Sequence, residues 1–382
     1  MGSAGMAGKE IIGLVLQGGG ALGAYQAGAF EELDAGGYCP HWYAGISIGA
    51  INAAIICGNP PENRVARLRE FWERVTSGAL TSFVVPDIMS AVSADLGADI
   101  TALFGAPGFF APRLPPVAPT LSYPPTSLSL YDTQPLRDTL SELVDFDLIN
   151  AKQDRLSIGA VNVRTGNFEY FDNMQDNICP DHVLASGALP PGFPPVEING
   201  ELYWDGGLVS NTPLQYILDN CDPKSNLCVF QVDLFSARGP VPETLLDVLH
   251  RDKEIRYSSR TRLNTDLLKR AHDLRVAVNR LSQKIRPELL TDPDWLALSD
   301  FGDVAGVTIV QLIHRRAAYE TDSKDYDFSR FSMEDHWKAG AADAIATLTD
   351  PKWVSRTRPE EDVVIFDCTK ELYKADKKRE PS

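Results

Sequence analysis

The sequence is poor in the residues from which metal centres and disulfide frameworks are built. Its 382 residues include only six cysteines and six histidines, and no two cysteines form a CxxC pair. Scattered cysteines in a chain of this size are typical of small buried hydrophobic side chains. We therefore expect neither a disulfide scaffold nor a metal site. The cysteines are Cys39, Cys57, Cys179, Cys221, Cys228 and Cys368.

A long uninterrupted apolar run is also lacking. A long charge-free stretch, residues 42–61, contains serine, asparagine and several glycines, and it ends in two prolines. This composition indicates a buried strand, turn and helix rather than a membrane span. No signal-peptide pattern opens the chain. The prediction is a cytoplasmic protein, either soluble or attached peripherally to a membrane.

Positive charge is scarce. The chain has 36 Lys and Arg against 52 Asp and Glu, a net charge of −16, which argues against nucleic acid as a partner. Residues 250–290 are the exception, with eleven basic and five acidic side chains. This stretch is either the solvated face of long helices or a surface that docks on anionic lipid headgroups.

Four short apolar runs are typical of strands buried on both faces of a mostly parallel sheet. Helical patterns at 21–35 and 48–58 follow the first two runs. This alternation predicts an α/β layered domain over residues 9–235. Residues 236–382 are expected to be mainly helical, including a helix over 332–348 that opens with a Ser332/Asp335 capping pattern. The four strand-like runs are 10–17, 41–47, 155–163 and 226–235.

Between residues 88 and 130 the composition changes. Residues 104–130 hold seven prolines and a single charge, Arg113. Such a sequence forms neither a regular helix nor an interior strand. Because it also contains Phe104, Phe109 and Phe110, we expect an apolar flap packed on the domain rather than a disordered loop.

The pentapeptide GISIG, Gly45 to Gly49, is a G-x-S-x-G pattern that joins an apolar strand to an apolar helix. A nucleophile elbow requires this context. Glycines at both ends permit a tight turn that projects the hydroxyl of Ser47, and the following helix directs its positive end toward that hydroxyl. Ser47 is therefore the candidate nucleophile.

The run GGGALG contains a G-x-G-x-x-G match at Gly18, Gly20 and Gly23. A dinucleotide-binding turn would need an acidic residue at the end of the second strand, where this chain has glycine, isoleucine and serine instead. The alternative is that Gly18, Gly19 and Gly20 present backbone N–H groups to an oxyanion beside Ser47. We prefer this second interpretation, which requires no cofactor.

The base that would activate the serine is less evident. In a hydrolase triad the histidine would be one of the last four in the chain, but none of these lies in a glycine- or proline-framed loop. Asp205 does lie in such a loop, before Gly206 and Gly207 and after an apolar strand-like segment. By itself, D-G-G is also the sequence of an ordinary turn.

Together, GGGALG, GISIG, D-G-G and the segment ASGALPPGFPPV at 185–196 resemble the patatin-like phospholipases over about residues 10–215. The segments at 130–136 and 210–214 are similar as well. The resemblance implies a three-layer α/β/α fold with a mostly parallel central sheet. It also implies a Ser–Asp dyad of Ser47 and Asp205, without histidine, and an oxyanion hole at Gly18 to Gly20.

The chain departs from that family at one position. The family usually has Arg or Lys two residues after the third glycine, where this chain has Leu22. A free carboxylate is also a poor base for a hydroxyl. We therefore expect an apolar pocket, formed by Tyr203, Trp204 and the flap, that raises the pKa of Asp205.

The leading hypothesis is a hydrolase of lipid acyl esters, such as phospholipids, with peripheral membrane contact through the flap and the basic 250–290 helices. Because Leu22 weakens the case for an anionic headgroup, hydrolysis of other esters or polyesters is the main alternative. A nucleotide-binding protein and a noncatalytic membrane adaptor are further alternatives. The missing acidic residue argues against the first, and intact Ser47 and Asp205 argue against the second.

Overall fold

The computed structural model describes residues 10–78, 101, 103–222, 225–239, 241–282, 284–299, 306–315, 325–359 and 363–369. In this part of the chain the side chains at 246, 249–250, 259–269, 272 and 299 are not included. Most of the first half of the predicted flap, residues 88–100, lies outside the described residues.

The described residues form a nine-stranded sheet in the order β11-β10-β9-β1-β2-β5-β8-β7, with β6 also paired to β5. The pairs from β11 through β5 are parallel, whereas β6, β7 and β8 run antiparallel to their neighbours. The strands are β1 (Ile11–Leu16), β2 (Trp42–Gly45), β5 (Arg155–Asn162), β6 (Phe168–Asp172), β7 (Val196–Ile198), β8 (Glu201–Asp205), β9 (Leu227–Asp233), β10 (Val307–Ile313) and β11 (Val363–Phe366).

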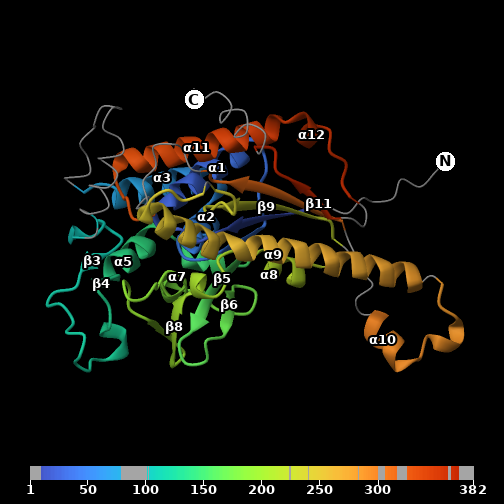
Figure 1. The fold of residues 1–382 in the computed structure, drawn as a ribbon, viewed down its shortest axis with the longest axis horizontal. Helices are drawn as coiled ribbons and strands as arrows, with labels where there is room; N and C mark the ends of the chain where they lie inside the picture. Colours follow the sequence, from blue (N-terminus) through green and yellow to red (C-terminus); the bar gives the residue numbers. More distant parts are fainter. Residues whose placement is uncertain are drawn as a thin grey trace.

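Helices cover both faces of the sheet (Figure 1). On one face, α8 (Leu214–Asn220) packs Leu214 and Ile217 against Val15 and Val229. On the other, α1 (Gly23–Ala35), α2 (Ile48–Cys57) and α11 (Arg330–Thr349) share the main core. The predicted α/β/α architecture and mostly parallel sheet are confirmed. The other helices of four or more residues are α3 (Arg64–Val75), α5 (Gln134–Leu143), α6 (Phe146–Asn150), α7 (Pro180–Ser186), α9 (Leu245–Ser282), α10 (Pro293–Ser299) and α12 (Pro351–Val354).

The four strands predicted from the sequence are β1, β2, β5 and β9, and they form the parallel centre of the sheet. The helical patterns at 21–35 and 48–58 correspond to α1 and α2. No helix in the described ranges has the length and apolarity required to cross a bilayer.

The C-terminal region contributes more to the sheet than its sequence suggested. We expected mainly helices, but β10 and β11 extend the sheet beyond β9. Helix α11 packs so closely on α1 that a Cβ on Gly28 would lie 1.9 Å from the carbonyl oxygen of Trp337. Its N-cap is Ser329, which accepts a hydrogen bond from the Ser332 amide, so the predicted Ser332 cap is wrong by one turn.

The register along β5 explains how the candidate residues meet. Residues 155–158 of β5 pair with β2, and residues 160–162 pair with β8. Because β6 occupies the opposite edge of β5, β2 and β8 lie end to end along the same edge. Gly45 is opposite Ile158 and Asp205 is opposite Ala160, so the turn after β2 faces the end of β8.

Candidate active site

Ser47 lies at the sharp turn between β2 and α2, in a conformation that L-residues rarely adopt. Its φ is 55° and its ψ is −123°. The turn requires glycine on both sides, since a Cβ on Gly45 would lie 2.3 Å from the carbonyl oxygen of Gly49, and one on Gly49 would lie 2.2 Å from that of Leu16. Backbone strain of this kind clusters at functional sites.

The backbone of Ser47 is fixed from a second element. Its amide donates to the hydroxyl of Ser186 at 2.9 Å, and that hydroxyl donates to the carbonyl of Gly159 at 2.7 Å. Ser186 ends α7, and Gly159 lies in β5. The serine turn is therefore connected to the centre of the sheet, which stabilises its strained conformation.

The glycine-rich loop follows β1 and passes beside Ser47. A Cβ on Gly18 would lie 3.1 Å from the Ser47 Cβ, and Gly20 has a φ of 56°. The N–H of Gly18 donates to the carbonyl of Asn211 at 3.3 Å. Among the described residues, the N–H groups of Gly19 and Gly20 have no acceptor. Two of the three predicted amides are thus available to a ligand.

Two buried amide side chains hold this loop in place. The Asn211 side chain donates to the carbonyl of Gly18 at 3.0 Å, and the main-chain carbonyl of Asn211 accepts the Gly18 N–H. Gln17 accepts the amides of Leu234 and Phe235 at 2.6 and 3.0 Å. These hydrogen bonds hold the loop to the residues that follow β9 and to the segment after Asp205. The conformation of the loop is therefore fixed before any ligand binds.

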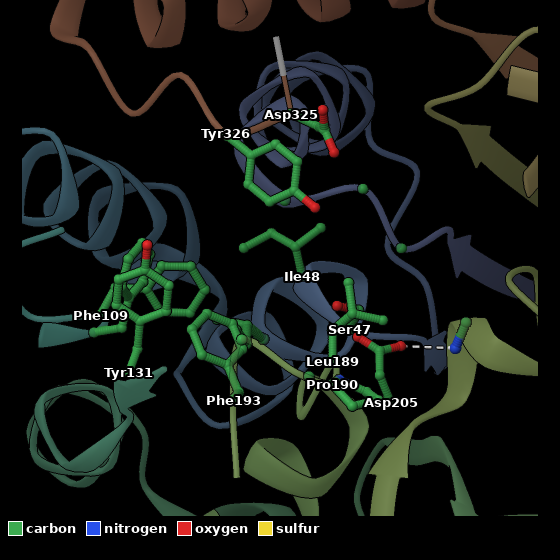
Figure 2. A pocket seen from close by; sticks show the side chains of 18 of the residues that line it. Ser47, Ile48, Phe109, Tyr131, Leu189, Pro190, Phe193, Asp205, Asp325 and Tyr326 are labelled. Atoms are coloured by element: carbon green, nitrogen blue, oxygen red, sulfur yellow. Dashed lines mark hydrogen bonds between the residues drawn. The ribbon is translucent and has the colours of Figure 1, made fainter. Parts of the chain in front are cut away.

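Asp205 ends β8 and its side chain is buried beside Ser47. One carboxylate oxygen accepts the N–H of Gly207 at 2.7 Å (Figure 2). Burial raises the pKa of this carboxyl from 3.8 to about 6, while hydrogen bonding with the Ser47 side chain and the Gly207 amide lowers it in part. The expected rise in basicity is therefore found, and desolvation is its main cause.

The serine, the aspartate and the three loop glycines line one cavity of about 440 Å³. Its walls are mostly apolar, and its volume lies within the range of small-molecule sites. Figure 2 shows Phe109, Tyr131 and Phe193 grouped on one side of Ser47. Phe110 and Phe328 join this aromatic cluster, with ring centroids 4.9 to 6.2 Å apart.

The flap supplies part of this wall, but Tyr203 and Trp204 do not line the cavity. Phe109 and Phe110 are buried, and residues 111–112 (β3) pair with 131–132 (β4), whereas Phe104 is 66% exposed. The Tyr203 hydroxyl donates to Glu169 instead. The described part of the flap packs on the domain at Phe109 and Phe110, whereas most side chains over 114–128 are exposed. Tyr203 and Trp204 do not have the role that we expected for them.

The remaining motif glycines have packing roles. Gly23 contacts Ile48, Gly206 approaches the Gly159 carbonyl, and Gly207 lies against Asp205. Leu22 is fully buried in the core and does not line the cavity. The side chains of His250 and His272 are not described. Of the other four histidines, none lines the cavity. The described residues also contain no group of three or more potential metal ligands.

Four polar side chains of the cavity lining come from the C-terminal region and were not predicted from the sequence: Lys253, Tyr257, Asp325 and Tyr326. The first two come from α9, within the stretch that we interpreted as a basic surface. Asp325 accepts the N–H of Ala21 through its main-chain carbonyl at 2.9 Å. Nothing in their local sequence marks these residues, because their approach depends on how the C-terminal region packs. Asn211, in contrast, lies in the segment 210–214, whose resemblance to the patatin-like phospholipases was evident from the sequence.

Two family models match the chain. The family model described as patatin-like phospholipase matches residues 14–218, and a second, described as patatin phospholipase, matches residues 255–360. No curated protein sequence matches the chain.

Two solved structures are similar at 14% sequence identity. VipD from Legionella pneumophila aligns over 97% of this chain and 74% of its own, with a TM-score of 0.35. The complex of full-length SpcU with full-length ExoU, from the type III secretion system of Pseudomonas aeruginosa, aligns over 92% of this chain and 75% of the matched chain, with a TM-score of 0.26. The family match covers more than half of the chain, which therefore belongs to the patatin-like phospholipases, a family of lipid ester hydrolases.

Proposed function

We propose that the chain hydrolyses lipid acyl esters with Ser47 as nucleophile, Asp205 as general base, and the N–H groups of Gly19 and Gly20 as oxyanion hole. The observation that carries this proposal is the convergence of these groups on one apolar cavity. The nucleophile is strained and exposed to the cavity, the carboxylate has a raised pKa, and the two amides lack an acceptor within the described structure.

In the acylation step, the Ser47 oxygen attacks the ester carbonyl carbon while its proton passes to Asp205. The carbonyl oxygen becomes an oxyanion, which the two loop amides and the N-terminal end of α2 stabilise. The bond between carbon and the alkoxy oxygen then breaks. The departing alcohol takes the proton from Asp205, leaving an acyl ester on Ser47.

In the deacylation step, water attacks the acyl carbon and gives its proton to Asp205. The second tetrahedral intermediate breaks its bond to Ser47, whose oxygen recovers the proton. The fatty acid leaves, and the enzyme returns to its starting state. The aromatic cluster around Phe109 and Phe193 would hold the acyl chain through both steps.

Labelling with a fluorophosphonate tests the nucleophile assignment. Attack by the serine oxygen on phosphorus displaces fluoride and leaves a stable adduct. We expect mass spectrometry to find one adduct per chain, on the peptide that contains Ser47, and excess lipid substrate to slow its formation. An adduct elsewhere, or none at a probe concentration that labels other serine hydrolases, would contradict the proposal.

We also propose that the flap contacts the lipid surface. Leu114, Leu121 and Leu130 are 83%, 61% and 61% exposed, and Leu130 lines the cavity. Exposed apolar side chains of this kind insert between lipid headgroups.

The double substitution Leu114→Ser/Leu121→Ser tests that contact. The measurement is the fraction of protein that sediments with phosphatidylcholine vesicles. We expect the partition coefficient calculated from that fraction to fall at least about tenfold. Val354→Ser is the matched control, because Val354 is 70% exposed on α12. If the flap variant and the control sediment equally with vesicles, the flap does not form the membrane contact.

A further inference from the structure

An ion pair lies at the polar end of the cavity. The Lys253 ammonium donates to the Asp325 carboxylate, and its nitrogen lies 4.5 Å from the ring centroid of Tyr326. All three residues line the cavity. Only 26% of the Lys253 side chain and 11% of the Asp325 side chain are exposed, so the pair is shielded from bulk water.

This pair is directly connected to the glycine-rich loop. The main-chain carbonyl of Asp325 accepts the Ala21 N–H at 2.9 Å, and a Cβ on Gly20 would lie 2.2 Å from that carbonyl oxygen. Figure 2 shows Asp325 and Tyr326 together on the opposite side of Ser47 from Asp205. The ion pair and Ser47 therefore face the same cavity, which places the pair where a charged headgroup of a bound ester would lie.

The charges that line the cavity restrict which headgroup fits. Lys253 is the single basic side chain among the described lining residues, which also include Asp205 and Asp325. Position 22 supplies no cation, because it is a buried leucine. A group with only negative charge would take Lys253 from Asp325 and leave that carboxylate unpaired beside it. Leaving a shielded charge without a partner is costly.

We propose that Lys253, Asp325 and Tyr326 form a headgroup subsite that selects esters carrying both a phosphate and an ammonium group. This inference rests on the proposed function of Ser47 and specifies its substrate class. The substrate ammonium takes the place of the Lys253 ammonium between the Asp325 carboxylate and the Tyr326 ring, an arrangement that recognises alkylammonium ions. The released Lys253 then pairs with the phosphate. Every charge retains a partner after this exchange.

The experiment compares kcat/KM for three substrates with identical acyl chains: phosphatidylcholine, phosphatidylglycerol and diacylglycerol. Each is diluted in excess neutral detergent micelles, so that surface charge does not affect recruitment. We expect the wild-type protein to prefer phosphatidylcholine over phosphatidylglycerol by about tenfold or more, the effect of one ion pair in a shielded site. A preference for phosphatidylglycerol would overturn the proposal.

Two substitutions test the assignment of the residues. Asp325→Asn keeps the main-chain carbonyl. It is expected to abolish the preference, so that the kcat/KM ratio of phosphatidylcholine to phosphatidylglycerol becomes about one. Lys253→Gln is expected to lower kcat/KM about tenfold for both phospholipids, and by less for diacylglycerol. Lys338→Gln, which removes one exposed positive charge on α11, should retain the wild-type preference.

The subsite is refuted if Asp325→Asn and Lys253→Gln both keep the wild-type ratios among the three substrates. Hydrolysis of all three that still depends on Ser47 would then leave the proposed function intact and remove only its headgroup selection. Absence of hydrolysis of any substrate, together with no fluorophosphonate adduct on Ser47, would instead show that the proposed function itself is wrong.

Discussion

Ser47→Ala is expected to lower kcat for ester hydrolysis by about 10⁵- to 10⁶-fold, the range found when a catalytic serine is removed. The substitution deletes the oxygen that forms the acyl-enzyme in the proposed mechanism. It retains the Ser47 amide that bonds to Ser186 and the helix that follows. The measurement is the rate of fatty acid release from micellar substrate, with the fluorophosphonate adduct as a second readout.

Two comparisons make that result specific. Ser141→Ala changes an exposed serine on α5 and should leave both readouts at the wild-type level. The circular dichroism spectrum of Ser47→Ala should match that of the wild-type protein, since no packed atom other than the hydroxyl oxygen is lost. If the folded variant retained more than about one part in a hundred of the activity, Ser47 would not be the nucleophile.

The parallel centre of the sheet could be predicted because its strands are short, apolar and bounded by turns. The runs at 10–17 and 226–235 consist mostly of apolar residues, as expected for strands covered on both faces. Residues 307–313 have the same character but were not recognised. A short apolar run fits a buried helix equally well, and this one lies among charged helical segments.

The candidate site was predictable where its chemistry depends on local backbone geometry. The turn at Ser47 and the loop at Gly20 need residues without a Cβ, so glycine marks both in the sequence. The proximity of Asp205 to Ser47 had no such mark, since it depends on β2 and β8 sharing one edge of β5. It came from resemblance to the patatin-like phospholipases rather than from spacing.

The C-terminal part of the cavity could not be predicted for a related reason. Lys253 and Asp325 are separated by 72 residues and meet only because the described C-terminal segments converge on the glycine loop. A basic helical stretch indicates a solvent-exposed helix face, and the sequence does not show which of its side chains points toward the cavity. The basic side chain that lines the described cavity therefore comes from α9, far along the chain from position 22.

Asp205→Asn is expected to lower kcat about 10²- to 10⁴-fold, the usual contribution of a general base. The asparagine can still accept the Gly207 N–H but cannot take the serine proton. In the wild-type protein, kcat/KM should rise about tenfold per pH unit up to about pH 6 and then level off, because only the ionised carboxylate accepts the proton. The variant should lack this rising limb.

Asp233 provides the matched control for this titration. Its carboxyl is also buried, and burial raises its pKa to about 7, but it does not line the cavity. Asp233→Asn should therefore keep the rising limb near pH 6. If the limb disappears in Asp233→Asn and persists in Asp205→Asn, the base has been assigned to the wrong carboxylate.

Stability separates loss of chemistry from loss of folding in Asp205→Asn. Because the Asp205 pKa is higher in the folded than in the unfolded protein, the folded state binds this proton more tightly, and stability falls as pH rises from about 4 to about 6. Each unit of that shift costs about 1.4 kcal/mol above pH 6. Asparagine removes the buried charge, so at pH 8 the variant should unfold at the same temperature as the wild-type protein or higher. A markedly lower unfolding temperature would mean that the carboxylate contributes to the fold and that the loss of activity has a structural cause.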